Sequence, residues 1–414
     1  MNQLTPTITL WQGIGLLTTS LLGTSVFILP QLTVRLASDG AIGAWLLLLL
    51  VMLPITWVFA QLGQRYPDAG GPATFVRLAF GPRAGAAIGL LFLAVSPIGL
   101  PAAMMMTLAF AEALVPLTAE HKLALGIGIS VSLVWVSLRG LQLSGQLQLW
   151  LTGLILILFA LLLVGNLEVL RWPQFDAIRS PSVLTAAGVA LWAFLGIEAF
   201  SHLSAEFKRP QRDFLPAMMI GLLLVAAIYL VATCLLLDGA SGTAQGLAMA
   251  GLATHTFGPI GALCIGGLGV LAGIATMNTY FNSMARLLWR LAEQGYLPRA
   301  CAQLNRQRLP QRAMILLASL QISSLVLAYG LAWDFEHLLA PSNGIFVLVY
   351  GLSMLAGYRL LGPKTKAIAL VAALLMALFG LSLGAQMLYG LVAMIAVMLL
   401  LWWRKPQPHS AAAP

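Results

Sequence analysis

Segments of about 20 consecutive apolar residues recur along the whole chain, and each is long enough to cross a lipid bilayer. We count twelve of them, centred near residues 23, 52, 100, 129, 156, 193, 226, 272, 321, 346, 375 and 395. Hydrophobic residues make up 60% of the chain and charged residues 8%, which lies outside the range of soluble globular domains. The sequence therefore predicts an all-α integral membrane protein with about 12 transmembrane helices in one domain, residues 1–405.

Basic residues gather on one side of the predicted membrane. With twelve spans, both termini lie on the same side, and 18 of the 22 Lys and Arg residues fall there. The four on the other side are Arg35, Lys122, Arg171 and Arg179. This asymmetry follows the positive-inside rule, so we expect both termini to be cytoplasmic. We attribute the net charge of +9 to these cytoplasmic Lys and Arg residues, which orient the chain in the membrane and contact anionic lipid head groups. We therefore expect no nucleic-acid partner.

Two of the apolar segments are interrupted by glycine in corresponding positions. The first, about residues 10–37, contains Gly23-Thr24-Ser25, and the sixth, about residues 183–203, contains Gly196-Ile197-Glu198. A glycine loosens a helix where lipid offers no replacement for a lost backbone hydrogen bond. Such a break survives only where it faces protein or a water-filled cavity. Paired breaks therefore predict the substrate site of a secondary transporter.

The spacing of the two breaks predicts an inverted repeat. Spans one to five and six to ten, about residues 10–168 and 183–360, each begin with a broken helix. An odd number of spans sets the second half in the opposite orientation, and the site would lie near the midplane where the breaks cross. Two extra helices, over about residues 365–403, fall outside the repeat. The Pro-rich residues 406–414 are predicted to form a disordered cytoplasmic tail.

Two cytoplasmic connections are longer than the others. The one over about residues 65–83 opens with Arg65-Tyr66-Pro67-Asp68-Ala69-Gly70-Gly71-Pro72, whose Pro and Gly content predicts a turn rather than a helix. The other covers about residues 286–312, and its first half is predicted to continue the eighth span until Gly295 ends it.

The first break offers hydrogen-bond donors for an anion. If the helix unwinds at Gly23, the amides of Gly23, Thr24 and Ser25 lose their helical acceptors and lie at the positive end of the following half-helix. That geometry suits a carboxylate. The alternative is a glycine that serves packing, with hydroxyls bonded back to the preceding turn.

Glu198 is the one acidic residue that we place deep in the membrane. A carboxylate at the bilayer centre costs about 3 kcal/mol even on the lenient insertion scale, so it is a functional candidate by default. It can carry a proton, gate the site, or bond the amides of the break, which would be a structural role. His202 lies four residues later and can face the same side, which favours proton handling. A solvated, idle His202 at the cytoplasmic end is the alternative.

Other spans supply candidate walls and ion ligands. Trp192 can cover a substrate as an aromatic gate, with core packing as the alternative, and Ser96-Pro97-Ile98-Gly99 distorts the third span and exposes backbone. The eighth span holds a polar stretch that suits either sodium or interhelical hydrogen bonds: Thr276, Asn278, Thr279, Asn282 and Ser283. The coupling ion stays open between proton, sodium and none. We expect no cofactor and no resident metal.

At these residues the chain resembles the amino acid–polyamine–organocation (APC) superfamily of transporters, over essentially its whole length. The motifs that carry this likeness are Leu22-Gly23-Thr24-Ser25-Val26-Phe27, Tyr66-Pro67-Asp68-Ala69-Gly70-Gly71-Pro72, Phe194-Leu195-Gly196-Ile197-Glu198, Glu206-Phe207-Lys208-Arg209-Pro210, and Arg286-Leu287-Leu288 through Gly295-Tyr296-Leu297-Pro298. Further phrases resemble a subgroup of bacterial inner-membrane exporters of methionine and branched-chain amino acids: Gln12-Gly13-Ile14-Gly15-Leu16-Leu17, Gly99-Leu100-Pro101-Ala102-Ala103 and Asn343-Gly344-Ile345-Phe346.

The resemblance implies a LeuT-type fold and a substrate pose. The substrate carboxylate would meet the amides from Gly23 to Ser25, and its amino group would meet carbonyls around the sixth-span break, near Phe194 and Gly196. Trp192 would be the aromatic gate, and Glu198 would stand at the acidic position of the family. Ser25 departs from the pattern, because many members have a second glycine there. The family's proton-linked lysine of span five is also not matched.

These observations predict a secondary active transporter that exports methionine, leucine, isoleucine and valine across the bacterial inner membrane, driven by the membrane potential or by proton antiport. No second intramembrane acid is available for a cationic cargo, which argues against lysine, arginine and polyamines. An importer or exchanger of the same fold is the alternative. An intramembrane enzyme would need paired catalytic groups at membrane depth, and a channel would need a pore-lining repeat. A pure sensor stays open, although the loops are too short for a signalling domain. The oligomeric state is not predicted.

Overall fold

The computed structural model describes residues 8–68, 70–139, 145–169, 180–237, 247–305 and 309–403. In these ranges it consists of helices and short connections, with one isolated β-bridge between Ile8 and Phe207. Eleven helical stretches in this part of the chain are long and apolar enough to cross a membrane, and the shorter apolar helix Leu10–Leu22 precedes them. The first stretch, Leu29–Arg65, joins half of the broken first span to the second span, so all twelve predicted segments are accounted for. The predicted all-α membrane fold is confirmed.

Each span is one helix or a pair of shorter ones. The first five spans and their connections comprise α1 (Leu10–Leu22), α2 (Leu29–Ala37), α3 (Ala41–Arg65), α4 (Gly71–Phe80), α5 (Pro82–Leu93), α6 (Ser96–Glu112), α7 (Ala119–Leu138) and α8 (Gly145–Gly165). The remainder comprises α9 (Ser182–Ala190), the 3-10 turn η4 (Leu191–Phe194), α10 (Ile197–Ser201), α11 (Pro210–Leu236), α12 (Ala248–Phe257), α13 (Pro259–Glu293), α14 (Gln311–Gly330), α15 (Phe335–Leu360), α16 (Pro363–Ser382) and α17 (Met387–Trp403).

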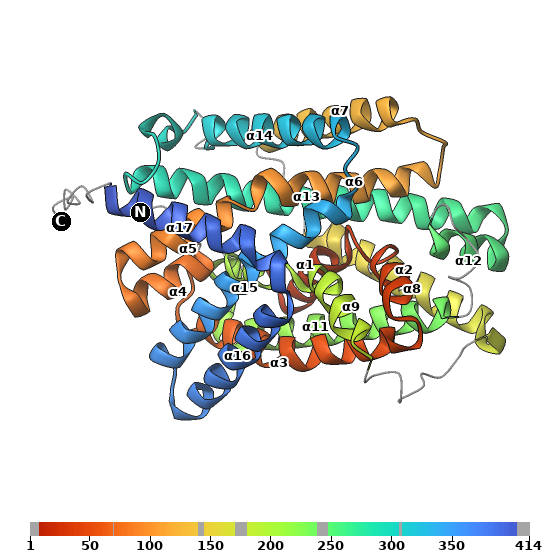
Figure 1. Cartoon of the computed structure of the whole chain (residues 1–414), viewed down its shortest axis with the longest axis horizontal. Coiled ribbons are helices and arrows are strands. Elements are labelled where there is room, and N and C mark those ends of the chain that lie inside the picture. Colours follow the sequence, from red (N-terminus) through yellow and green to blue (C-terminus); the bar gives the residue numbers. More distant parts are fainter. Residues whose placement is uncertain are drawn as a thin grey trace.

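The broken helices lie in the middle of the molecule. Helix α1 packs against α8 and α11, and α2 packs against α9. On one side of them α13 pairs with α6, and α14 packs on α7, while α3 and α11 lie on the opposite side (Figure 1). Helices from both halves of the chain therefore pack around the two breaks. The boundaries of the inverted repeat stay a prediction, and the tail at residues 406–414 lies outside the described residues.

Both predicted breaks are present. Turns over residues 23–28 separate α1 from α2, and the second break runs through η4, Leu195 and Gly196 before α10 begins. Gly196 has a φ of 137°, which L side chains rarely adopt. The third span is also divided, between α5 and α6, and Pro97 lies in the first turn of α6, where its missing N–H costs no helical bond. The predicted distortion at Ser96-Pro97 is therefore present.

The connection after the second span differs from its prediction. A turn follows Arg65, but helix α4 already begins at Gly71 and continues to Phe80. The prediction of a turn instead of a helix was wrong from Gly71 on, because Pro72 occupies the first turn of α4, where proline is well tolerated. The other long connection agrees with its prediction: α13 continues to Glu293, and Gly295 follows with a φ of 79°.

Candidate functional site

A small cavity with a volume of about 40 Å³ lies between the two breaks. Its walls come from α1 and the first break, from α5 and α6, from the second break, and from α13 and α15: Ser20, Leu21, Thr24, Ser25, Val95, Gly99, Leu100, Ala103, Trp192, Leu195, Thr276, Met277, Tyr280, Met284 and Phe346. This volume is well below the roughly 300–1,000 Å³ of ligand-binding clefts, so the walls are nearly closed on one another in this structure. No member of this lining is a charged residue, and the polar members are hydroxyl groups and the Trp192 indole. The cavity is therefore an apolar chamber with a hydroxyl-rich wall.

The first break keeps more of its backbone hydrogen bonds than the sequence predicted. The amide of Gly23 still donates to Thr19 O at 2.8 Å, and that of Ser25 donates to Leu22 O at 3.0 Å. Only the amide of Thr24, of the three, has no acceptor among the described residues. The prediction of three freed amides was wrong for Gly23 and Ser25, because the chain tightens into successive turns instead of opening.

Gly23 is required by packing against α13. A Cβ atom at this position would overlap the hydroxyl of Thr276 and lie 2.6 Å from Ala272 O. The Thr276 hydroxyl also donates to Thr19 O at 3.2 Å, so α13 is bonded directly to the last turn of α1. Gly23 therefore lets α13 approach the break, and it does not line the cavity itself.

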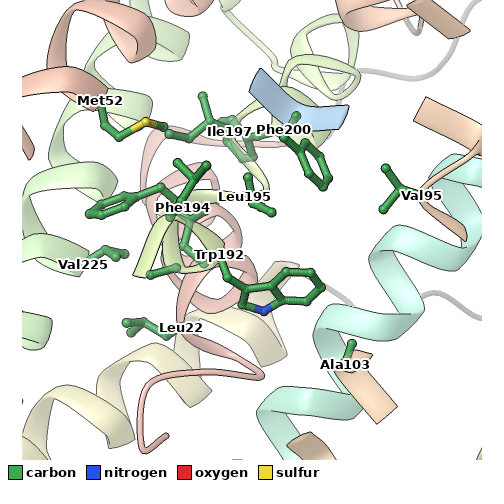
Figure 2. Close-up of a cluster of buried hydrophobic side chains, with 14 of the residues drawn as sticks. Leu22, Met52, Val95, Ala103, Trp192, Phe194, Leu195, Ile197, Phe200 and Val225 are labelled. Atoms are coloured by element: carbon green, nitrogen blue, oxygen red, sulfur yellow. The ribbon is translucent and has the colours of Figure 1, made fainter. Parts of the chain in front are cut away.

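Trp192 joins the two breaks across the cavity. Its indole Nε1 donates to Thr24 Oγ1 at 3.4 Å, and the far edge of the ring would lie 3.7 Å from a Cβ at Gly99. Figure 2 shows the indole pointing toward Ala103, whereas the ring of Phe194 points the opposite way. Phe194 is fully buried and packs against Trp45 and Tyr229. The two aromatic residues of η4 thus face the cavity and the core respectively.

Glu198 organises the second break. Its side chain is fully buried and accepts a hydrogen bond from Gly196 N at 3.0 Å. It also accepts from the phenol of Tyr280, at 3.3 Å, and it is hydrogen-bonded to the phenol of Tyr350. The Tyr350 hydroxyl lies 3.2 Å from Phe194 O as well. The carboxyl group therefore ties the break to α13 and α15, and Tyr280 extends from it to the cavity wall.

The hydroxyl of Ser25 is fixed from outside the cavity. It forms a hydrogen bond of 2.6 Å with the phenol of Tyr229 on α11, and the same phenol lies 3.3 Å from Leu21 O. Tyr229 stacks on Trp45 of α3 with ring centroids 4.4 Å apart. Ser25 thus lines the cavity while its hydroxyl is held by Tyr229 of α11.

The residues predicted from the sequence divide into two groups. Thr24, Ser25, Gly99 and Trp192 line the cavity. The others support it from behind: Gly23, Ser96, Phe194, Gly196 and Glu198. Ser96 donates its hydroxyl to Leu93 O at 2.7 Å and thereby caps the kink between α5 and α6.

His202 lies at the end of α10. Its side chain is 9% exposed, and its ring lies beside Gly71 of α4 and 6.1 Å from the ring of Phe92. The solvated position considered as an alternative is therefore wrong, because α4 covers this end of α10. The ring packs at the junction of α10 with α4 and α5, and His202 is not among the residues that line the cavity.

The sequence pattern did not identify several residues of the site. Tyr280 and Tyr350 hold Glu198, and Met284 and Phe346 close the cavity. None of them lies in a glycine-broken segment. Because a buried carboxyl group needs hydrogen-bond partners, the sequence does predict that Glu198 has some. It does not show which of the many aromatic residues supply them.

The polar stretch of the eighth span makes hydrogen bonds within the protein. Thr279 donates to Ala275 O and accepts from Gln148 of α8, and Asn282 bonds Asn278 and Ser137 of α7. These contacts match the interhelical alternative. In the described part of the chain, no three His, Cys, Asp or Glu residues are grouped so that they could hold a metal ion.

Comparison with known proteins agrees with this geometry. The model of the family described as amino acid permease matches residues 8–413. The L-methionine/branched-chain amino acid exporter YjeH of Escherichia coli is 38% identical over 98% of both chains. An uncharacterized amino acid permease of Bacillus subtilis, YecA, is 27% identical over 88% of this chain and 87% of its own length. The cadaverine/lysine antiporter of Escherichia coli is 23% identical over 76% of this chain and 72% of its own length. The chain belongs to the amino acid permease family.

Proposed function

We propose that this permease transports neutral, apolar amino acids, namely methionine, leucine, isoleucine and valine. The observation that carries this proposal is the lining of the cavity, which offers hydroxyl groups at the first break and apolar side chains elsewhere, with no charged residue. An apolar pocket with a few convergent polar groups suits a ligand that is polar at one end only. The printed name of the 38%-identical relative gives the same cargo.

Cationic cargo is disfavoured on the same grounds. Relatives at 23% and 24% identity carry the names cadaverine/lysine antiporter and putrescine transporter. Burying a second amine in this cavity would need a paired acid, because an unpaired buried charge is costly. Glu198 is separated from the cavity by Tyr280, which uses its hydroxyl to bond the carboxyl group.

The proposed pose follows the polarity of the walls. The carboxylate of the substrate would lie against the free amide of Thr24 and accept hydrogen bonds from the hydroxyls of Ser20 and Thr24. Its amino group would meet backbone carbonyls of the second break, and Met277, Met284 and Phe346 would surround the side chain. Trp192, bonded to Thr24, would cover the substrate.

Export by proton antiport is the proposed mode, and Glu198 is the proposed proton carrier. Tyr350 has one phenolic proton but lies within hydrogen-bond distance of both Glu198 and Phe194 O. Both contacts are full hydrogen bonds at once only when the carboxyl group is protonated and donates to Tyr350. Loss of that proton would release Phe194 O and loosen the break. His202, at the other end of α10, is the second candidate on a proton path. Import or exchange by the same fold is the alternative.

The proposed location is the bacterial inner membrane, with both termini cytoplasmic. The support is the excess of Lys and Arg on the side of the termini, of which Arg306, Arg308, Arg404 and Lys405 lie outside the described residues. Two of the four basic residues on the opposite side, Arg171 and Arg179, also lie outside them.

The test is uptake of radiolabelled amino acids into inverted membrane vesicles, with and without an imposed proton gradient. We expect gradient-stimulated uptake of methionine and leucine, and none of lysine or putrescine. Glu198→Gln should abolish the stimulation. Asp213→Asn is the matched control, because Asp213 is a buried carboxylate that is paired with Arg209 at the start of α11 and does not line the cavity. Lysine uptake would overturn the substrate class, and stimulation that survives Glu198→Gln would overturn the role of Glu198.

A further inference from the structure

A groove on the outer surface of the bundle combines an apolar floor with one arginine. It lies between α4, α5, α15 and α17 and has a volume of about 600 Å³. Arg83, in the first turn of α5, is its one charged lining residue, and the floor includes Phe80, Ala87, Leu352, Met394 and Met398. Figure 1 shows α4, α5 and the end of α17 together at one end of the molecule. This groove is separate from the cavity between the breaks, with which it shares no lining residue.

A second arginine lies at the same end of the groove. The guanidinium of Arg359, in the last turn of α15, lies over the ring of Phe80 at 5.4 Å from its centroid. Neither Arg83 nor Arg359 forms an ion pair with an acid of the described residues. Two exposed arginines, Arg83 in the groove lining and Arg359 over the ring of Phe80, therefore present positive charge that the described part of the chain leaves without an ion-pair partner.

The opposite end of the groove is entirely apolar. A second hollow of about 670 Å³ continues along α15, α16 and α17, and it shares Leu352 and Leu355 with the first. Its lining consists of aliphatic residues, methionine and glycine only, from Val347 to Leu391. Trp402 lines the arginine end and is 80% exposed, as expected for an aromatic residue at the membrane–water interface. The arginines therefore lie at head-group depth, and the apolar hollow runs into the hydrocarbon.

We propose that this groove binds one phospholipid with an anionic head group. Arg83 and Arg359 would hold the phosphate-bearing head group, and an acyl chain would lie along Leu352, Leu355 and Met394 toward the second hollow. A charge at one end and a continuous apolar channel at the other match an amphiphile, and basic pockets between helices are a known mode of binding anionic lipid head groups. A free phosphate ion would use only the arginines and would leave the channel empty.

The test is photo-crosslinking in vesicles of phosphatidylcholine that contain a trace of phosphatidylglycerol with a diazirine in its acyl chain, followed by peptide mapping. We expect it to label residues 347–355 and 391–402 on the order of tenfold more than the matching diazirine phosphatidylcholine. Salt at 1 M should remove this preference in the unaltered protein, because the Debye length is then about 3 Å. Equal labelling by both lipids, or a preference that salt does not change, would overturn the proposal.

Variants locate the site. Arg83→Gln and Arg359→Gln should each lower labelling by phosphatidylglycerol about fivefold. Arg139→Gln should leave it unchanged, since Arg139 also lies over an aromatic ring, Trp135, but on α7. Ala84→Phe keeps every charge and narrows the groove, so it should also lower labelling. Persistence of labelling in Ala84→Phe, or its equal loss in Arg139→Gln, would contradict binding in this groove.

Discussion

The two helix breaks look alike in the sequence, yet they are stabilised in different ways. At the first break the amides of Gly23 and Ser25 still donate to backbone carbonyls within tight turns, and α13 packs directly against Gly23. At the second, Gly196 adopts a left-handed conformation and its amide is bonded by the carboxyl group of Glu198. The first break is therefore uncharged and held by packing, whereas the second depends on an ionisable group. The comparison suggests a fixed wall at one break and a switchable one at the other.

The largest effect is expected from alanine at the two glycines. Gly23→Ala should destabilise the protein by about 1–3 kcal/mol through overpacking, and Gly196→Ala by a similar amount through backbone strain. Thr276→Ala should relieve part of the first, because it removes the hydroxyl that the new Cβ would overlap. Leu21→Ala should not relieve the second, although Leu21 Cδ2 lies 2.9 Å from the added Cβ, since the φ of 137° remains. Thermal unfolding of the purified single and double variants measures both pairs, Gly23→Ala with Thr276→Ala and Gly196→Ala with Leu21→Ala, as double-mutant cycles.

Gly128→Ala is the control for both glycine substitutions. Nothing lies within 4 Å of a Cβ at Gly128, which is within helix α7, so its unfolding midpoint should stay the same or rise slightly, because alanine favours a helix more than glycine does. Rescue of Gly196→Ala by Leu21→Ala would mean that side-chain contact, and not backbone conformation, distinguishes the second break.

A smaller effect is expected at the partners of Glu198. Tyr350→Phe should cost about 1 kcal/mol, because it leaves Phe194 O without its donor and removes one partner of the carboxyl group. Tyr280→Phe removes a single bond of 3.3 Å and should cost less. Urea or thermal unfolding gives the stabilities. Equal costs for the two variants would contradict the central position of Tyr350.

The smallest effect is expected from the bond that joins the breaks. Trp192→Phe and Thr24→Val each remove the contact between Nε1 and Oγ1, so we expect each to raise the KM for methionine several-fold. Because they share one interaction, the double variant should be little worse than either single one. Fully additive effects on KM would show that this bond does not couple the breaks.

The spans and breaks were predictable because their signals are local. Runs of apolar residues mark the helices, and glycine and proline mark the interruptions at Gly23, Pro97 and Gly196. The start of α4 was missed because Pro72 was interpreted as a helix breaker, although at the first turn of a helix it is compatible with helix.

The far walls of the site were not predictable from one sequence. Met284 and Phe346 reach the cavity, and Tyr350 reaches Glu198, only through the packing of α13 and α15 around the breaks. The role of Gly23 was misjudged for the same reason: the pressure on it comes from Thr276, more than 250 residues away in sequence, as the bond from Thr276 to Thr19 across 257 positions illustrates.

The claim that the cavity between the breaks holds the substrate is tested most directly by equilibrium binding of radiolabelled methionine to a purified variant in which a bulky side chain fills this cavity. Ala103→Phe places a ring in the cavity, and Ala377→Phe makes the same change in the outer hollow on α16, which is the matched control. Size-exclusion chromatography checks that both variants are folded. We predict that Ala103→Phe weakens methionine binding by at least about tenfold, equivalent to about 1.4 kcal/mol, while Ala377→Phe binds like the unaltered protein. Unchanged binding by Ala103→Phe would contradict the claim that the cavity between the two breaks holds the substrate.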